Sequence, residues 1–312
     1  MRELLIDHKS SPSIKSNSRM TKLKAQKSIT TILDGKSVSV ELCPDREIDF
    51  ELLSKLNVKF CSVTWLGNSK ENFNTPNTIP AISLANHLGC LGYNVLLHIT
   101  GRNLNRTEAE IILNYVKDVG IVNILALQGD PSQILEKDDS KCDFPYAADF
   151  VKFIKNEYKN IFCVGVAGYP QIHPNSINKH QDLLHLKNKV DAGADFVLTQ
   201  ACFSQDLFKN FALSCKSYNI HTPIIPGIFI INSYKSLLAM VTFCGVKVPN
   251  DILKNMETHK NDDNTNNTMY GIKLAQDLIT SLFNEFTDIH IFTLNNLQSV
   301  NNVICNLSFT DQ

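Results

Sequence analysis

From residue 37 onward, short apolar runs rich in β-branched residues alternate with longer stretches of helical periodicity. Short apolar runs of this composition are typical of strands, whereas apolar positions that recur every three or four residues indicate amphipathic helices. We therefore predict strands over 37–43, 58–65, 93–100, 122–128, 161–168, 195–200, 223–229 and 289–294. Helices are predicted near 47–56, 76–91, 107–119, 145–158, 178–192, 204–217, 234–243 and 268–286, with a last one near 295–306.

The order of these elements predicts an α/β fold, a single-domain (β/α)8 TIM barrel over residues 31–312. Strands that are apolar along nearly their whole length are buried on both faces, as in a parallel sheet whose strands alternate with helices. An open doubly wound sheet is the alternative, but no G-x-G-x-x-G motif follows the first predicted strand. Two polar stretches, 131–143 and 257–268, are predicted to be mobile surface loops.

Residues 1–30 differ from the rest of the chain, because they hold seven Lys or Arg residues, many serines and little apolar periodicity. This composition predicts a basic, Ser-rich, disordered tail. A mitochondrial presequence is the other interpretation, and Glu3 and Asp7 count against it because presequences are poor in acidic residues. We therefore expect a cytoplasmic protein.

The composition excludes several classes of protein. A chain of 312 residues with 43% hydrophobic residues and a net charge of −1 suits a soluble globular protein, and it gives no sign of a nucleic-acid partner. Apolar stretches stay well short of a membrane span. The nine cysteines form no C-x-x-C pair, so we expect reduced thiols and no metal site.

Polar side chains stand at the end of nearly every predicted strand. In a (β/α)8 barrel the carboxyl ends of all strands meet at one rim, where such enzymes carry out their chemistry. Because burying unpaired polar groups is costly, so many polar strand ends favour a functional site there. The residues concerned are Glu41, Thr64, His98, Thr100, Asp130, Tyr169, His173, Thr199, Gln200, Thr293 and Asn295.

Three of these residues have more than one interpretation. Asp130 follows a buried strand in a Gly-Asp-Pro turn, where it could cap the turn or point at a ligand. His98 suits a core histidine bonded to a backbone carbonyl. Glu41 lies within an apolar strand, so its carboxyl must be paired or kept partly protonated by desolvation. A carboxyl whose pKa is raised in this way is suited to proton donation.

The predicted helix over 178–192 carries a polar stripe. Asp182, His185 and Lys189 are spaced at i, i+3 and i+7, which places them along one side of a helix. The stripe could be a solvated surface. It could also face the phosphates and sugar of a nucleotide, with Lys189 supplying positive charge.

Five motifs, in this order and spacing, resemble the methylenetetrahydrofolate reductase family. They are "NILALQGDP", "VAGYPQIHP", "DLLHLKNKVDAGADFVLTQ", "PIIPGIF" and "FTLN", and the resemblance covers about residues 37–307. It implies a TIM barrel that binds FAD at its rim. It also implies a ping-pong oxidoreductase of one-carbon metabolism, in which NADH or NADPH reduces the flavin. The reduced flavin then converts 5,10-methylenetetrahydrofolate to the 5-methyltetrahydrofolate of methionine biosynthesis.

The resemblance also implies roles for individual residues. Glu41 matches the acid that protonates the folate and opens its five-membered ring to an iminium ion. Asp130 matches the aspartate beside flavin and pterin, where its negative charge favours the cationic iminium form of the folate. Gln200 and Asn295 match substrate-binding positions. FAD-binding positions are matched by Thr64, His98, Gln128, Gly129, Asp130, Tyr146, Ala147, Tyr169, His173, Asp182, His185 and Lys189.

Several residues depart from the family pattern. The usual RGDP is QGDP here, so Gln128 replaces an arginine that helps to hold the flavin. The usual EFFPPR is ELCPDR, in which Glu41 is kept and two aromatic residues are lost. The other replacements are Cys202 for Phe, Ile230 for Pro and Asn296 for Arg. We expect these replacements to fall on the ligand rim.

These replacements support two alternatives to an active reductase. One is a diverged, non-catalytic barrel that serves as a scaffold or as a subunit of a larger assembly. The other is a flavin-dependent reductase of altered substrate, since fold does not fix function. The family also leads us to expect a homo-oligomer. Eukaryotic relatives usually carry a C-terminal regulatory domain, and we expect this chain to be a eukaryotic-like catalytic barrel without one.

Overall fold

The computed structural model describes residues 25–65, 72–129, 143–260 and 265–307. Its strands form one parallel sheet in the order β7-β6-β5-β4-β3-β2-β1-β9-β8. The strands are β1 (Ser37–Leu42), β2 (Cys61–Val63), β3 (Val95–Thr100), β4 (Asn123–Leu127), β5 (Cys163–Gly168), β6 (Phe196–Thr199), β7 (Ile224–Ile225), β8 (Gly227–Phe229) and β9 (Asp288–Phe292). Each of the eight predicted strands is therefore confirmed.

The barrel closes through a strand that is divided at Pro226. β7 pairs with β6 on one side, and β8 pairs with β9 on the other. Proline has no N–H to donate to a neighbouring strand, which interrupts the pairing between the two segments. The carbonyl of Pro226 still accepts a bond of 2.8 Å from the backbone of His290. The predicted strand over 223–229 therefore becomes two short strands, and the predicted barrel is confirmed.

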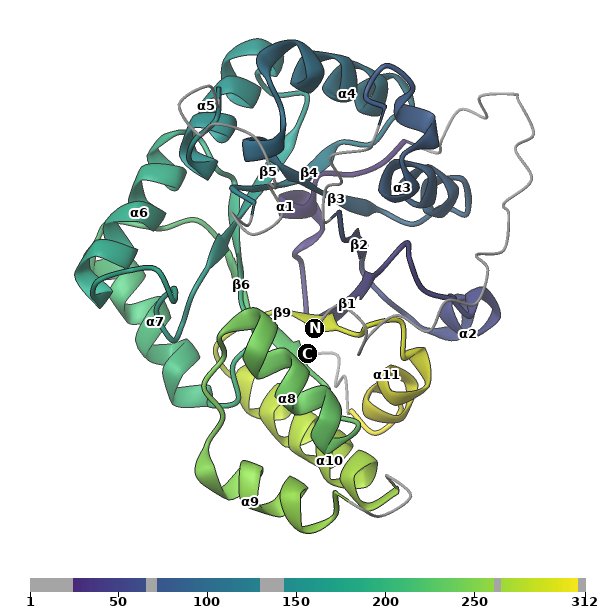
Figure 1. The fold of residues 1–312 in the computed structure, drawn as a ribbon, viewed down its shortest axis with the longest axis vertical. Coiled ribbons are helices and arrows are strands. Elements are labelled where there is room, and N and C mark those ends of the chain that lie inside the picture. The colour runs from purple at the N-terminus through teal and green to yellow at the C-terminus, as the bar shows by residue number, and fades with distance from the viewer. Residues whose placement is uncertain (1–24, 66–71, 130–142, 261–264, 308–312) are drawn as a thin grey trace.

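Helices surround the sheet in a ring (Figure 1). All nine predicted helices are present, and the described residues add α1, α9 and two 3-10 turns. The helices are α1 (Ile29–Ile32), α2 (Phe50–Lys55), α3 (Pro80–Cys90), α4 (Arg106–Asp118), α5 (Ala147–Tyr158), α6 (Lys179–Asp191), α7 (Gln205–Ser217), α8 (Tyr234–Cys244), α9 (Asn250–Thr258), α10 (Thr265–Leu282) and α11 (Leu297–Ile304), with turns η2 (Pro76–Thr78) and η3 (Gly101–Asn103).

The two predicted surface loops have different outcomes. Residues 130–142 lie outside the described residues. In the stretch 257–268, the first residues end α9 and the last ones begin α10, so the second prediction is wrong at both ends. Ile252 and Met256 of α9 are buried in an apolar cluster with Leu237 and Met240 of α8, which explains why a mostly polar segment folds as a helix.

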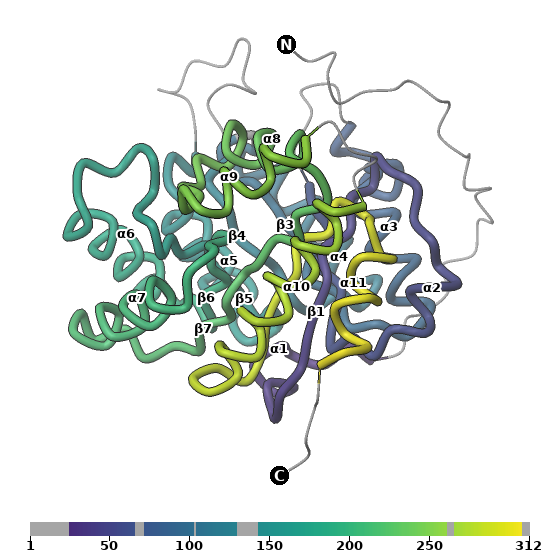
Figure 2. Tube along the Cα trace, turned by 90° about the horizontal axis from the view of Figure 1, so that it is seen from below, coloured from purple at the N-terminus to yellow at the C-terminus, as the bar shows by residue number. Residues whose placement is uncertain are grey.

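The N-terminal segment closes the barrel at the amino ends of the strands. Figure 2 places α1 at one end of the barrel and α8 at the other. Ile29 is fully buried in an apolar cluster with Phe60, Leu96 and Phe196. The predicted disordered tail is therefore wrong for residues 25–30, because tertiary contacts order a segment whose composition is that of a tail. Residues 1–24 lie outside the described residues.

Asn123 fastens this segment to the sheet. Its Oδ1 accepts a bond of 2.8 Å from the backbone N–H of Ile29, and its Nδ2 donates to the carbonyls of Lys27 and Val95 at 3.1 Å and 3.3 Å. The side chain is fully buried. Asn123 therefore makes two bonds to the backbone of the segment and one to β3, which ties the segment to the sheet.

Replacing Asn123 with alanine should lower the free energy of unfolding by about 2 kcal/mol, because buried backbone groups lose their partners. Urea denaturation measures this change. Asn114→Ala is the matched control, since Asn114 is exposed on α4 and should change the free energy by less than about 0.5 kcal/mol. Equal losses in the two variants would contradict the assigned role of Asn123.

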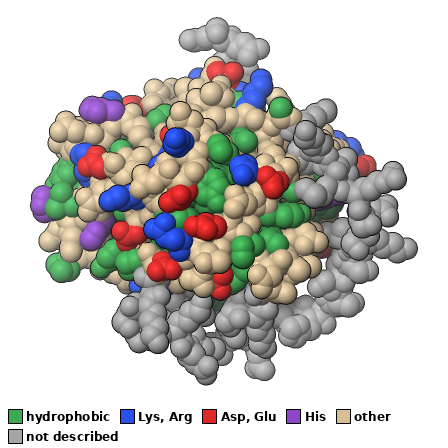
Figure 3. Space-filling model, turned by 90° about the horizontal axis from the view of Figure 1, so that it is seen from above, with side chains coloured by type: hydrophobic (Ala, Val, Ile, Leu, Met, Phe, Trp, Pro, Cys, Tyr) green, Lys and Arg blue, Asp and Glu red, His purple; other side chains and the backbone are tan. Residues whose placement is uncertain are grey.

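The surface of the described residues carries charges of both signs. Figure 3 shows Lys and Arg side chains interspersed with Asp and Glu, separated by apolar and uncharged polar atoms. This distribution agrees with the net charge of −1. Among the described residues, no helix combines the length and apolar character needed to cross a membrane.

Candidate functional site at the carboxyl ends of the strands

Glu41 lies near the end of β1, at the rim opposite α1. Its exposed fraction is 9%. The neighbouring side chains of Val40 and Leu42 pack in the main apolar core, and because side chains alternate along a strand, Glu41 points to the other face of the sheet. The thiol of Cys43 lies 3.9 Å from Oε1 of Glu41. The backbone carbonyl of Glu41 accepts a bond of 2.5 Å from the hydroxyl of Thr293, which follows β9.

The environment of Glu41 makes it a weak acid. Burial raises the pKa of its carboxyl to about 7, because the charged form loses its hydration. Hydrogen bonds from Thr64 and Cys43, and then the charge of Arg46, oppose this rise in pKa. The carboxyl therefore takes up and releases a proton near neutral pH, as expected for a desolvated acid within an apolar strand.

Two buried histidines, His290 of β9 and His98 of β3, lie among the strands of the barrel. His290 of β9 bonds through Nδ1 to Ser39 at 2.7 Å and through Nε2 to Ser62 at 3.0 Å. Burial lowers the pKa of His290 to about 3 and that of His98 to about 4, so both rings are neutral at pH 7. Nε2 of His98 has no hydrogen-bond partner among the described residues. A buried ring nitrogen without a partner is a candidate hydrogen-bonding group for a ligand.

A second group of predicted residues meets where β5 ends and α6 packs. The ring of Tyr169 meets the ring of His173 edge to face at 4.5 Å between centroids. Nζ of Lys189 lies 5.8 Å from the centroid of the Tyr169 ring and donates to the carbonyl of Ala167 at 2.5 Å. Asp182 accepts a bond of 3.0 Å from Ser176. The structure thus brings four predicted residues together.

Burial also shifts the acidity of this second group. It lowers the pKa of Lys189 to about 8, against the opposing charge of Asp182. It raises the pKa of Tyr169 to about 12, with further increases from Asp182 and Cys244. His185, the third member of the predicted helical stripe, is exposed on α6. A partly buried cation beside an aromatic ring is suited to an anionic, planar ligand.

The residues that follow β4 form the edge between the two groups. Nε2 of Gln128 donates to the carbonyl of Pro145 at 2.8 Å, which ties the end of β4 to the start of α5. Tyr146 is 61% exposed, and Ala147 is the first residue of α5. Gly129 has φ +93°, a conformation that strains any other residue.

Asp130 lies outside the described residues. Its distance from Glu41, and its position relative to Tyr169 and Lys189, therefore stay predictions.

The two predicted substrate-binding residues make local bonds. Oε1 of Gln200 accepts from the backbone of Ala201 at 2.9 Å. The amide of Asn295 bonds the backbone of Cys43 through both of its polar atoms, at 2.8 Å each, and also donates to the carbonyl of Arg46 at 3.1 Å. Contact of either residue with a substrate stays a prediction.

The residues that depart from the family pattern do not all lie on the rim. Cys43 and Gln128 are partly exposed there. Cys202 and Ile230 are 1% and 2% exposed and belong to the main apolar core, and Asn296 caps α11 through a bond of 3.1 Å from Ser299. The expectation of a rebuilt rim is therefore wrong for these three, because the side chains turn into the core or toward a helix end.

His290 and Arg46 are residues that the sequence analysis did not assign to the site. His290 occupies an inward position of its strand, two residues before Phe292. The alternation of side chains along the strand could have identified His290, because side chains two residues apart share one face of a strand. Arg46 lies in a loop, where no periodicity places its charge.

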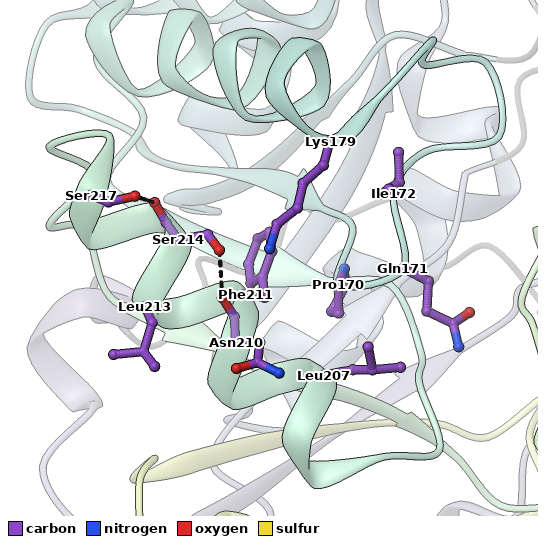
Figure 4. Close-up of a pocket in the computed structure, with 10 residues that line it drawn as sticks. All are labelled: Pro170, Gln171, Ile172, Lys179, Leu207, Asn210, Phe211, Leu213, Ser214 and Ser217. Atoms are coloured by element: carbon purple, nitrogen blue, oxygen red, sulfur yellow. Dashed lines mark hydrogen bonds between the residues drawn. The ribbon is translucent and has the colours of Figure 1, made fainter.

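Two cavities of the described surface lie away from these residues. One of about 500 Å³ lies between the loop after β5 and helices α6 and α7, and Figure 4 shows the side chain of Lys179 extending from α6 toward Phe211 of α7. The other, of about 340 Å³, shares Gln171 and Leu207 with it. Neither is lined by a predicted site residue. The candidate site therefore rests on the convergence of the strand ends.

Comparison with known proteins agrees with this geometry. A family model described as methylenetetrahydrofolate reductase matches residues 48–308. Methylenetetrahydrofolate reductase (NADH) 1 of Arabidopsis thaliana is 32% identical over 265 residues, which cover 81% of this chain and 44% of that protein. The probable methylenetetrahydrofolate reductase (NADPH) of Caenorhabditis elegans is 32% identical over 89% of this chain and 43% of that protein. This chain thus spans less than half the length of these two relatives.

A bacterial relative is matched along most of its own length. The 5,10-methylenetetrahydrofolate reductase of Pectobacterium carotovorum is 33% identical over 273 residues, which cover 84% of this chain and 87% of that protein. An uncharacterized protein from Clostridium thermocellum, solved as binding two copies of 5-methyl-5,6,7,8-tetrahydrofolic acid, has a TM-score of 0.62 at 15% identity and covers 88% of this chain and 95% of that one. At that identity the likeness shows the fold alone. The family model and the bacterial relative together show that this chain belongs to the methylenetetrahydrofolate reductase family.

Proposed function

We propose that this chain reduces 5,10-methylenetetrahydrofolate to 5-methyltetrahydrofolate, with NADH or NADPH as the electron donor and FAD as the bound cofactor. The observation that carries the proposal is Glu41, a buried carboxyl with a pKa of about 7 at the rim of a barrel of this family. General acids work best when their pKa lies near the operating pH.

The residues around the rim fit FAD. His98 offers a buried ring nitrogen that has no partner among the described residues, and Lys189 offers a partly buried cation for a diphosphate. The left-handed turn at Gly129 leaves backbone, rather than a side chain, next to Thr100. When bound, FAD would carry a hydride from the nicotinamide to the folate. We propose that His98, Tyr169, Asp182 and Lys189 hold it, together with Thr64, Gln128, Tyr146, Ala147, His173 and His185.

Glu41 then has a defined task at the folate. In its protonated form it donates a proton to a ring nitrogen of the substrate, which makes that nitrogen a better leaving group. The carboxylate that remains stabilises the positive charge that develops next to it. We propose that Asp130 adds negative charge beside the flavin and the pterin, and that Gln200 contacts the folate.

The visible absorption spectrum of the purified chain is the first test. We expect a yellow protein, or an apoprotein that becomes yellow on addition of FAD. The flavin should then lose its colour with NADH or NADPH under anaerobic conditions and regain it with 5,10-methylenetetrahydrofolate. Both NADH and NADPH should be tested, because one relative is named for NADH and another for NADPH. A colourless chain that takes up no FAD would contradict the proposal and favour a non-catalytic scaffold.

A flavin-dependent reductase of altered substrate gives a different result in the same experiment. Its flavin would be reduced by a nicotinamide donor, yet 5,10-methylenetetrahydrofolate would not restore the colour. The two half-reactions therefore separate the three functions without any variant.

Gln128 provides a test of the cofactor position. We expect Gln128→Arg to tighten FAD binding by about 5- to 30-fold, because a charge-assisted bond to an anionic cofactor is worth about 1–2 kcal/mol. Titration of the apoprotein with FAD, followed by flavin fluorescence, measures the dissociation constant. Gln298→Arg is the matched control. Gln298 is exposed on α11, so this substitution adds the same charge at a different place on the surface. An equal gain in both variants would mean that position 128 has no contact with the cofactor.

A further inference from the structure

The thiol of Cys43 lies between the Glu41 carboxyl and the hydroxyl of Thr64. Cys43 Sγ lies 3.9 Å from Oε1 of Glu41 and 3.8 Å from Oγ1 of Thr64. A thiol is a weak hydrogen-bond donor, and this one has a carboxyl oxygen within reach. The family pattern has an aromatic residue at this position, so the contact is a property of this chain.

The backbone of Cys43 is held by a residue in the loop that follows β9, the strand next to β1. Oδ1 of Asn295 accepts from the N–H of Cys43, and Nδ2 of Asn295 donates to the carbonyl of Cys43, both at 2.8 Å. Asn295 has φ +65°, a conformation that asparagine tolerates better than most residues. Its own N–H bonds the hydroxyl of Thr293 at 2.9 Å, and that hydroxyl donates to the carbonyl of Glu41. Two residues after β9 thus hold both ends of the segment from Glu41 to Cys43.

We propose that Cys43 is a positioning residue, whose thiol, held by Asn295, orients the Glu41 carboxyl and sets the pH at which it releases its proton. The proposal deepens the proposed function, because this setting matters for catalysis only if Glu41 is the proton donor. The contact itself does not depend on the substrate.

The charges around the carboxyl are consistent with this role. Burial, and then the charge of Glu41, raise the pKa of the Cys43 thiol to about 12, so Cys43 is a neutral donor throughout the physiological range. Arg46, in the loop after β1, favours the carboxylate. Cys244 at the end of α8 also faces Glu41, and burial followed by that carboxylate raises its pKa, so it stays neutral as well. Among the described residues, Cys43 and Thr64 are therefore the uncharged side chains whose hydrogen bonds favour the ionised form.

The test is a direct titration of Glu41 in the purified full chain, without folate. Infrared difference spectra follow the carbonyl stretch of the protonated carboxyl, and Glu41→Gln identifies the band. We expect Cys43→Ala to raise the titration midpoint by about half a pH unit, because the carboxylate loses a donor. Cys43→Ser keeps a donor and should recover part of that difference.

Cys305→Ser is the matched control, since Cys305 lies on the exposed end of α11 and should leave the midpoint unchanged. Asn295→Ala should raise the midpoint in the same direction as Cys43→Ala, because the thiol loses its support. Thermal melts show whether each variant is folded before it is titrated. An unchanged midpoint in folded Cys43→Ala, or an equal rise in Cys305→Ser, would overturn the proposal.

The outcome is separable from that of the proposed function. A midpoint that moves in Cys43→Ala supports the positioning role even if the chain fails to reduce folate. A chain that reduces folate while the midpoint stays fixed keeps the proposed function and loses the role of Cys43. If the proposed function and the role of Cys43 are both correct, Cys43→Ala should shift the pH profile of folate reduction by as much as it shifts the titration midpoint of Glu41. The loss of a purely structural contact would not shift the pH profile.

Discussion

Replacing Glu41 with glutamine should lower the rate of folate reduction by about 10²- to 10⁴-fold, the usual contribution of a general acid, while flavin reduction by NADH or NADPH stays within a few-fold. Glutamine keeps the size and the hydrogen-bonding capacity of the side chain but has no proton to donate near neutral pH. The hydride that the nicotinamide delivers needs no proton from this carboxyl. The loss should therefore fall on one half-reaction only.

Rapid mixing under anaerobic conditions separates the two half-reactions. Flavin bleaching by the nicotinamide reports the first, and flavin recolouring by 5,10-methylenetetrahydrofolate reports the second. Glu257→Gln is the matched control, because Glu257 is an exposed residue of α9 that pairs with Lys260 on the surface. Equal losses in both half-reactions of Glu41→Gln would point to a damaged flavin site instead of a missing proton donor.

The same substitution should stabilise the fold at alkaline pH. The pKa of Glu41 is raised from 4.5 to about 7 in the folded chain, so between these values the folded state binds the proton more tightly than the unfolded state. The protonation of Glu41 thus contributes to the free energy of unfolding in full below pH 4.5, and this contribution is lost as the pH rises through 7. From these two pKa values, wild type should lose about 3 kcal/mol between about pH 4.5 and pH 8 through this group, whereas Glu41→Gln loses none of it.

Urea denaturation of both proteins at several pH values measures this difference. The gap in unfolding free energy between Glu41→Gln and wild type should widen as the pH rises, and it should level off above about pH 8. A gap that is the same at low and high pH would mean that the carboxyl is not desolvated. A stabilised but inactive variant is typical of residues kept for function at a cost in stability.

The sequence predicted the barrel because the strands are buried on both faces. Runs such as 122–128 and 161–168 are apolar along most of their length, and their spacing left room for one helix between each pair. Pro226 was visible inside the predicted strand over 223–229, and it is where that strand divides. Proline within a strand pattern is a signal for such a break.

Helices α1 and α9 were missed for different physical reasons. α1 has only four residues, and its order comes from Asn123 and the apolar cluster around Ile29, which no local pattern reveals. α9 did carry a signal, because Ile252 and Met256 are spaced at i and i+4 within a polar run. Short helices of this kind depend on tertiary packing more than on propensity.

The candidate site was predictable where strand position fixed a side chain. Glu41 was expected to be desolvated because it lies inside an apolar strand, and the structure places it in that environment. The bonds of Asn295 to Cys43 and the burial of Cys202 depend on how loops pack, and sequence periodicity carries no information on that. Sequence motifs locate rim residues, whereas the packing of the loops decides which of them face a ligand.

The most direct test of the account is the pH dependence of folate reduction in a single turnover of the wild-type chain. The account predicts a rate that is constant at low pH and falls about tenfold per pH unit above a midpoint near 7, because only protonated Glu41 is active. Flavin reduction by the nicotinamide, measured on the same sample, should lack this midpoint. A rate of folate reduction that does not change across that range, or the same midpoint in Glu41→Gln, would contradict the claim that Glu41 supplies the proton.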